Sequence, residues 1–174
     1  MRIEEVVGAV DLYDEERHDL VRSESLEAET VGSVQRARTR NSVRDAAAGD
    51  ARAVAVSLGN AALAKKGEDV LLLDVRGLTL IADYFLLITG KNRVHVRALS
   101  DAVEEEARKV GRRARRTEGR DEGSWVLLDY GDVIVHLFTE EERAYYQLER
   151  LWGDAPRELL GGGEADPQER SVHP

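Results

Sequence analysis

The stretch that decides the fold is Leu127-Leu128-Asp129-Tyr130-Gly131-Asp132, which continues directly into Val133-Ile134-Val135-His136-Leu137-Phe138. Its two apolar runs flank the pair Gly131-Asp132. A two-residue connection of this kind favours a tight turn, because glycine adopts a positive φ angle without a Cβ clash. Such a turn fixes the register, so that Tyr130 lies opposite Val133 and Trp125 lies opposite Phe138. The sequence therefore predicts a β-hairpin centred on this turn.

Side chains alternate between the two faces of a strand, so this hairpin has two faces of different chemistry. The first face is almost entirely aliphatic and is predicted to lie against helices: Val126, Leu128, Tyr130, Val133, Val135 and Leu137. The second face mixes aromatic groups with an acid and a titratable ring: Trp125, Leu127, Asp129, Ile134, His136 and Phe138. Because an unpaired carboxylate is costly to bury, we predict that the second face is open and binds a partner through these six residues. The alternative is a sheet with helices on both sides, in which Trp125 and Phe138 are core partners.

The composition limits the class of protein. A chain of 174 residues with 42% hydrophobic and 34% charged residues and a net charge of −9 suits one soluble domain with tails. The absence of cysteine excludes disulfides and thiolate metal sites. The first residues lack the pattern of a secretory signal, and no apolar run approaches the roughly 20 residues that span a bilayer. We therefore expect a cytoplasmic protein that does not bind membranes.

Periodicity and turn signals predict one α/β domain over residues 42–158, with a mixed five-stranded sheet flanked by helices. Capping signals and helical spacing predict helices over residues 42–66, 92–110 and 139–152. Short apolar runs predict buried strands over residues 69–75 and 84–89, the hairpin adds two strands, and an edge strand is expected within residues 112–117. Residues 1–41 are expected to form a polar, disordered extension and residues 159–174 a flexible tail.

Basic side chains cluster in one short segment. Residues 108–120 contain seven bases and a single acid, Glu118. Such a segment can neutralise the phosphates of RNA, and its candidate contacts are Arg112, Arg113, Arg115 and Arg116. The alternative is a solvated helix end and edge strand, where bases complement the helix dipole and discourage edge pairing. No aromatic residues interleave the arginines, as base stacking would require.

Signatures of catalysis are mostly missing. The chain has no glycine-rich phosphate loop, and its four histidines lack metal-ligand spacing. The remaining lead is a set of three acids, Asp74, Asp129 and Asp132, because converging carboxylates can hold magnesium for a nucleotidyltransferase-like reaction. However, Asp129 and Asp132 are separated by a turn, and Asp132 suits a turn hydrogen bond. We therefore predict a protein that is not an enzyme and needs no metal or cofactor.

Several blocks of the chain resemble one known family. They are Asp74-Val-Arg-Gly-Leu78, Ile81-Ala-Asp-Tyr-Phe85, Thr89-Gly90, Trp125-Val-Leu-Leu-Asp-Tyr-Gly-Asp-Val-Ile-Val-His136 and Tyr146-Gln-Leu-Glu-Arg-Leu-Trp-Gly-Asp-Ala155. In unbroken order over residues 50–156, these blocks resemble the ribosomal silencing factor family, also called Iojap-like proteins.

The resemblance implies a fold related to nucleotidyltransferases that has lost the catalytic acids. It also implies a translational repressor that binds the fourteenth protein of the large ribosomal subunit and prevents the small subunit from joining when nutrients are short. In the hairpin, Trp125 and Asp129 match the family's tryptophan and acid and are expected to contact that partner. We leave open whether ribosomal RNA, or a second copy of the chain in a homodimer, is bound as well.

Overall fold

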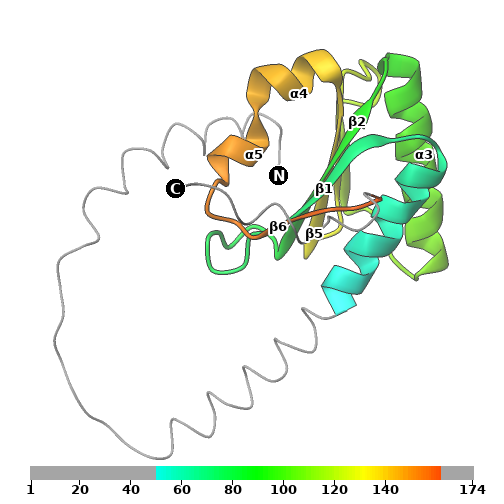
Figure 1. Ribbon diagram of the computed structural model, residues 1–174. Coiled ribbons are helices and arrows are strands. Elements are labelled where there is room, and N and C mark those ends of the chain that lie inside the picture. The colour runs from blue at the N-terminus through cyan, green and yellow to red at the C-terminus, as the bar shows by residue number, and fades with distance from the viewer. Residues whose placement is uncertain (1–49, 162–174) are drawn as a thin grey trace, which may run out of the picture.

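The structure is a computed structural model that describes residues 50–161. These residues form a mixed β-sheet with helices on both faces (Figure 1). In chain order the elements are a helix over residues 50–64, β1 (Glu68–Asp74), β2 (Tyr84–Gly90), α3 (Arg93–Lys109), β3 (Arg116–Glu118), β4 (Trp125–Asp129), β5 (Val133–Thr139), α4 (Glu140–Tyr146), α5 (Leu148–Leu151) and β6 (Arg157–Leu159). The strands lie in the order β3-β4-β5-β2-β1-β6. Strands β2 and β5 are parallel, and every other neighbouring pair is antiparallel. The predicted α/β class with a mixed sheet is confirmed, but with six strands rather than five.

The sixth strand, β6, lies where the sequence predicts the end of the domain. It pairs with β1, with Glu158 opposite Leu72, and all three of its side chains are exposed. Three exposed residues show no alternation of apolar and polar positions, so no sequence pattern marks this strand. The next residue, Leu160, is buried, and its amide donates to the Val70 carbonyl oxygen at 2.8 Å. The fold therefore continues past residue 158, into the first residues of the segment predicted to be a flexible tail.

The other elements begin and end close to the predicted residues. Asn92 caps α3 as predicted, because its side chain accepts a hydrogen bond from the His95 amide at 2.9 Å. The helix predicted over residues 139–152 is interrupted at Gln147, whose φ of 45° is left-handed, and so forms α4 and α5. The edge strand expected within residues 112–117 is the three-residue strand β3, which begins only at Arg116. The extension predicted over residues 1–41, the start of the first predicted helix and the tail beyond residue 161 lie outside the described residues.

The hairpin has the predicted register. Trp125 pairs with Phe138 and Asp129 pairs with Ile134. The Tyr130 amide donates to the Val133 carbonyl oxygen at 2.9 Å, which closes the turn. The local signal in the turn was therefore sufficient to place every side chain of β4 and β5 on its correct face.

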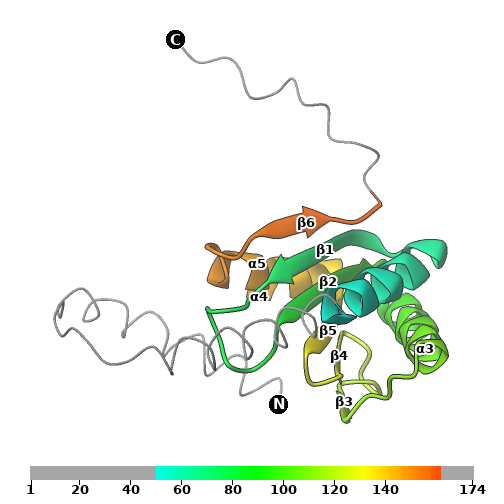
Figure 2. The ribbon, with the colours of Figure 1, turned by 90° about the horizontal axis from the view of Figure 1, so that it is seen from below.

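The first face of the sheet packs against the helix of residues 50–64 and against α3, as predicted (Figure 2). Every hairpin residue of this face is at most 3% exposed: Val126, Leu128, Tyr130, Val133, Val135 and Leu137. On the helix side, Leu58 and Leu99 are completely buried. Burial of this aliphatic surface is the main stabilising contribution to the domain. Within the described residues, none of the helices combines the length and hydropathy that a membrane span needs.

The prediction that the second face is open is wrong, because α4 and α5 cover it. Figure 2 shows these two helices on the side of the sheet opposite to α3. Leu148 and Trp152 pack against the face and form a second core with residues such as Phe85. Five of the six residues predicted to be open are at most 4% exposed: Trp125, Leu127, Ile134, His136 and Phe138. The alternative with helices on both sides of the sheet is therefore the observed one.

Arg143 holds the α4 cover to the sheet. Its guanidinium donates to the Asp69 carbonyl oxygen at 2.8 Å and to the Thr89 hydroxyl at 3.0 Å. It also forms an ion pair with Glu149 of α5 at 3.2 Å, and its side chain is only 11% exposed. Because one side chain joins α4, α5 and the sheet, the orientation of the cover is fixed by polar contacts as well as by apolar packing.

We predict that Leu127→Asp and Leu128→Asp both unfold the domain, since both leucines are 0% exposed and lie on opposite faces. An unpaired buried carboxylate costs several kcal/mol, which is comparable to a total stability of roughly 5–15 kcal/mol. The control is Leu159→Asp, because Leu159 is 58% exposed on β6. Thermal melting followed by circular dichroism tests this. Native melting of the Leu127 variant would contradict the burial of the second face.

Candidate partner-binding surface

Several segments of the fold meet at the hairpin turn. The Asp132 carbonyl oxygen accepts hydrogen bonds from the amides of Asp83 at 2.8 Å and Tyr84 at 3.1 Å, which ties the turn to the start of β2. The Asp132 carboxylate accepts hydrogen bonds from the Arg112 guanidinium at 3.2 Å and 3.0 Å. That contact ties the turn to the segment between α3 and β3. The turn therefore positions both neighbouring connections at this end of the sheet.

Arg112 reaches the turn because α3 ends in a Schellman motif. Gly111 has a φ of 75°, and its amide donates to the Arg108 carbonyl oxygen at 3.1 Å. The Arg112 amide donates to the Ala107 carbonyl oxygen at 2.7 Å. These two bonds satisfy the last carbonyl groups of the helix and reverse the chain. The reversal sends the Arg112 side chain toward Asp132.

The loop of residues 76–83 lies against the turn and presents two adjacent apolar side chains to solvent. Leu80 is 101% exposed and Ile81 is 38% exposed. Hydrogen bonds order the loop: the Val75 amide donates to the Asp83 carbonyl oxygen at 3.0 Å, and the Ile81 amide donates to the Thr79 hydroxyl at 3.2 Å. Adjacent exposed apolar groups on an ordered loop are a candidate contact for a partner protein.

Asp129 is the only one of the six predicted contact residues that the structure leaves partly exposed. It ends β4, next to the turn, and its carboxylate accepts a hydrogen bond from the Gly131 amide at 2.7 Å. The register of the strands places Asp129, Asp83 and the loop at the same end of the sheet. We call Leu80, Ile81, Asp83 and Asp129 the hairpin-end surface.

Trp125 is held inside the molecule by an aromatic cluster. Its Nε1 donates to Nδ1 of His136 at 3.2 Å, and its ring centroid lies 4.6 Å from that of Tyr146. His136 is 0% exposed, and burial lowers its pKa to about 3. The imidazole is therefore neutral at pH 7, and because Nδ1 accepts a hydrogen bond, its proton is on Nε2. Trp125 and His136 therefore stabilise the sheet beneath α4 and are not part of the exposed surface.

The three carboxylates of the catalytic alternative are each engaged by a different group. Asp74 accepts hydrogen bonds from the Arg76 guanidinium at 2.8 Å and 2.5 Å, and these bonds lower the pKa of Asp74. Asp132 is paired with Arg112, and Asp129 is bonded to the turn. Within residues 50–161, no three carboxylate or histidine side chains lie close enough together to hold a metal ion.

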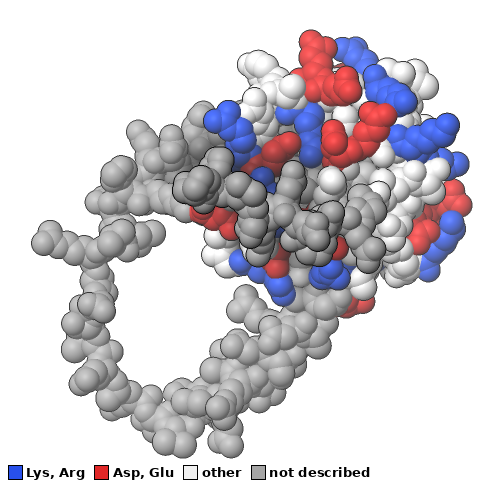
Figure 3. Space-filling view, viewed as in Figure 1, with Lys and Arg blue, Asp and Glu red and all other residues white. Residues whose placement is uncertain are grey.

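The basic segment is partly neutralised within the protein. Arg112 is paired with Asp132, and Arg116 forms an ion pair with Glu118 at 3.6 Å. The Arg115 guanidinium lies over Gly131 of the turn. On the face shown in Figure 3, acidic and basic side chains are interspersed where they are visible. The contact of these arginines with RNA stays a prediction.

A comparison with known families decides the relationship of this chain. The family model described as "Ribosomal silencing factor during starvation" matches residues 48–174. The chain belongs to the ribosomal silencing factor family. The resemblance inferred from the sequence blocks is confirmed, and the family role indicates a regulatory, ribosome-associated protein.

Relatives and solved structures agree with this assignment. The ribosomal silencing factor of Bacillus subtilis is 48% identical over 92 residues, which cover 53% of this chain and 78% of that protein. The chloroplastic protein Iojap of Zea mays is 36% identical over 106 residues, which cover 60% of this chain and 46% of that protein. A crystal structure of a Chromobacterium violaceum protein superposes with a TM-score of 0.58 at 32% identity and covers 64% of this chain and 92% of that one. A Bacillus halodurans structure gives a TM-score of 0.54 at 38% identity, over 64% of this chain and 99% of that one.

Sequence reasoning missed the exposed loop as part of the site. The signal was present in Leu78-Thr79-Leu80-Ile81, an apolar run within a connection between two strands. Such a run lies in the connection between two buried strands and has no helical partner spacing, so part of it can face solvent. Leu78 packs against the second core, whereas Leu80 and Ile81 do not.

The buried His136 predicts that the domain loses stability in acid. Its pKa falls from 6.5 to about 3 on folding, so the unfolded chain binds more protons between these values. Stability is therefore complete above pH 6.5 and decreases as the pH falls toward 3. Because of this group, the free energy of unfolding measured with urea should be roughly 1 kcal/mol lower at pH 5.5 than at pH 7.5. The His136→Phe variant should show a smaller difference. An unchanged pH dependence in that variant would contradict the assignment.

Proposed function

We propose that this protein represses translation by binding the large ribosomal subunit in the cytoplasm and keeping the small subunit from joining when nutrients are limiting. The membership of the ribosomal silencing factor family supports a role on the ribosome. The observation that carries the proposal is the hairpin-end surface, where a fully exposed leucine on an ordered loop lies beside two acids. Repression by occupying space needs a docking surface of this kind and no reactive group.

The chemistry of the hairpin-end surface points to a protein partner with a basic rim. Leu80 and Ile81 supply the apolar centre that a protein interface needs, and Asp83 and Asp129 supply acidic groups beside it. Acids at the edge of an interface select a partner that carries lysine or arginine there. We propose the fourteenth protein of the large subunit as this partner, as the family resemblance implies, with one copy of the chain per subunit.

The proposed roles of Trp125 and Asp129 differ. Asp129 is exposed enough to meet the partner directly. Trp125 is 4% exposed and lies under Tyr146, so it supports the contact by fixing the end of the sheet. The same supporting role is proposed for Leu127, Ile134, His136 and Phe138, which are even more deeply buried.

We predict that Leu80→Asp and Asp129→Arg each weaken binding to purified large subunits by about tenfold or more, because interface anchors and charge reversals have effects of this size. Co-sedimentation measures the binding. Leu159→Asp is the matched control for the leucine, since Leu159 is also exposed but lies on the edge strand β6, outside the hairpin-end surface. Asp129→Asn is the control for the acid, because it keeps a hydrogen-bond acceptor for the Gly131 amide. Undiminished co-sedimentation of folded Leu80 and Asp129 variants would remove this surface from the contact.

The inhibition itself should be stoichiometric and independent of metal and nucleotide. Light scattering of mixed ribosomal subunits reports their joining, and added protein should suppress the signal up to one copy per large subunit. A chelator and the removal of nucleotides should leave this suppression unchanged, because steric occupation consumes neither. Suppression at far less than one copy per subunit, or its loss in chelator, would contradict the proposal and favour an enzyme.

A further inference from the structure

A pocket lies between the end of α3 and the face of the sheet that α3 covers. Its volume is about 360 Å³, and its polar lining consists of Glu104, Arg108, Arg112, Arg113, Thr117 and Tyr130. Two alanines complete the wall. The volume lies within the range of pockets that hold small organic molecules, roughly 300–1,000 Å³. The lining carries three bases and one acid, so an anion is the favoured occupant.

The Tyr130 hydroxyl is the observation that points to a ligand. Tyr130 lies at the end of the first hairpin face and is 3% exposed. Its hydroxyl oxygen is fully buried and has no hydrogen-bond partner among the described residues. Buried polar atoms in folded proteins are almost always paired, so this hydroxyl is suited to a group that enters the pocket. Burial also raises the pKa of Tyr130, which keeps the hydroxyl protonated and able to donate.

Two guanidinium groups of the lining have donors available for the same ligand. Arg113 is exposed and forms no ion pair with a described residue. The Arg108 guanidinium lies 3.7 Å from the Glu104 carboxylate, which is beyond hydrogen-bond distance. Arg112 is less available because it is paired with Asp132.

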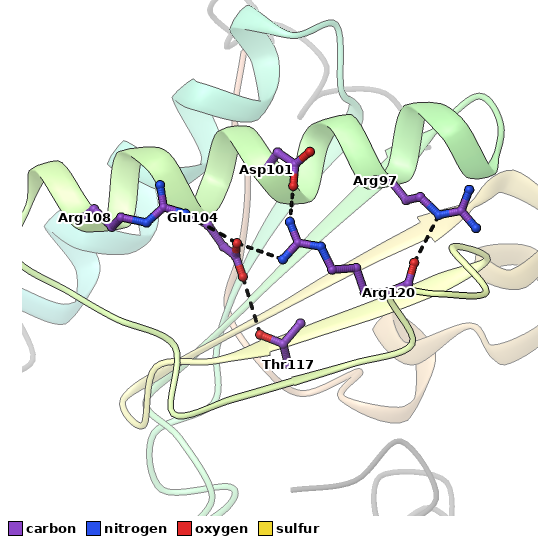
Figure 4. A network of polar contacts seen from close by, with 6 residues as sticks. All are labelled: Arg97, Asp101, Glu104, Arg108, Thr117 and Arg120. Carbon is purple, nitrogen blue, oxygen red and sulfur yellow. Dashed lines mark hydrogen bonds and ion pairs between the residues drawn. The ribbon is translucent and has the colours of Figure 1, made fainter.

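The acid of the lining, Glu104, has its shortest contact with Arg120, which lies outside the pocket lining. It accepts hydrogen bonds from Arg120 at 2.9 Å and from the Thr117 hydroxyl at 3.5 Å. Figure 4 shows its carboxylate between Arg120 on one side and Arg108 on the other, with Thr117 on the strand below. Arg120 is fixed in turn, because Arg97 donates to its carbonyl oxygen at 3.1 Å. The wall is therefore pre-organised. Glu104 is shared between Arg120 at 2.9 Å and a longer ion pair with Arg108 at 3.7 Å, so the lining, with three bases and this one acid, keeps an excess of positive charge.

We propose that this pocket binds a phosphate group, carried either by a free phosphorylated molecule of nucleotide size or by an RNA backbone. A phosphate offers several acceptor oxygens in different directions. Two planar guanidinium groups and a hydroxyl can donate to them at the same time, and arginine matches phosphate geometry especially well. The two oxygens of a carboxylate lie in one plane, whereas the oxygens of a phosphate point in several directions, so a phosphate suits these three donors better. The inference does not depend on the proposed contact with the large subunit.

The test is calorimetric titration of the full chain with inorganic pyrophosphate. Arg113→Gln and Tyr130→Phe should each weaken saturable binding by about tenfold, as expected for lost hydrogen bonds to a charged group. The control is Arg93→Gln, which removes the same charge at the other end of α3, roughly 24 Å away. It should leave binding unchanged. No saturable binding, or equal weakening by Arg93→Gln and Arg113→Gln, would overturn the proposal.

Competition experiments distinguish the two sources of phosphate. If AMP displaces pyrophosphate and a short RNA duplex does not, the site takes a free phosphorylated molecule. If the duplex displaces pyrophosphate and binds more weakly to both pocket variants, the site takes the RNA backbone. Displacement by neither would overturn the proposal. If Tyr130→Phe failed to fold, the exposed Arg113→Gln would still decide the result, because it disturbs no packing.

Discussion

The two-residue hairpin turn is the constraint on which the rest of this structure depends. Gly131 has a φ of 95°, which a residue with a Cβ atom adopts only with strain, so the turn favours glycine. The Arg115 guanidinium lies over the turn and would have to shift to make room for a side chain at residue 131. Because the turn fixes the register, a slip of one residue would exchange the aliphatic and aromatic faces of β4 and β5. Through Asp132, the same turn also positions the loop of residues 76–83 and the end of α3.

Two cores of different chemistry follow from this register, and they leave different surfaces for function. The aliphatic core holds the helix of residues 50–64 and α3, and the pocket with Tyr130 lies at its margin. The aromatic core holds α4 and α5 and closes the face that would otherwise be open. What remains exposed at the hairpin end is the loop with Leu80 and the carboxylate of Asp129. The protein can therefore present a binding surface without giving up burial on either face of its sheet.

Local signals in the sequence predicted the parts of the fold that local physics determines. The turn fixed the hairpin register, Asn92 marked the start of α3, and the buried runs marked β1 and β2. Tertiary contacts decided the rest. That α4 and α5 cover the second face depends on the break at Gln147, which divides the predicted helix into two shorter helices. Strand β6 is held by backbone pairing with β1, and its three exposed side chains form no pattern that predicts a strand. The same limit applies to the site: the partial exposure of Asp129 agrees with the prediction, but the burial of Trp125 does not, because a periodic pattern does not tell which faces other elements cover. A contact of Asp129 with a partner stays a prediction.

Hydrogen–deuterium exchange of the protein, free and bound to the large ribosomal subunit, tests the central claim most directly. The claim is that the hairpin end of the sheet docks on the subunit while α4 stays in place over the aromatic core. It predicts added protection for the amides of residues 76–83 and of the turn, with exchange in α4 and α5 unchanged. Added protection confined to α4, α5 or β6, or faster exchange in α4 that signals opening of the aromatic core, would contradict the account.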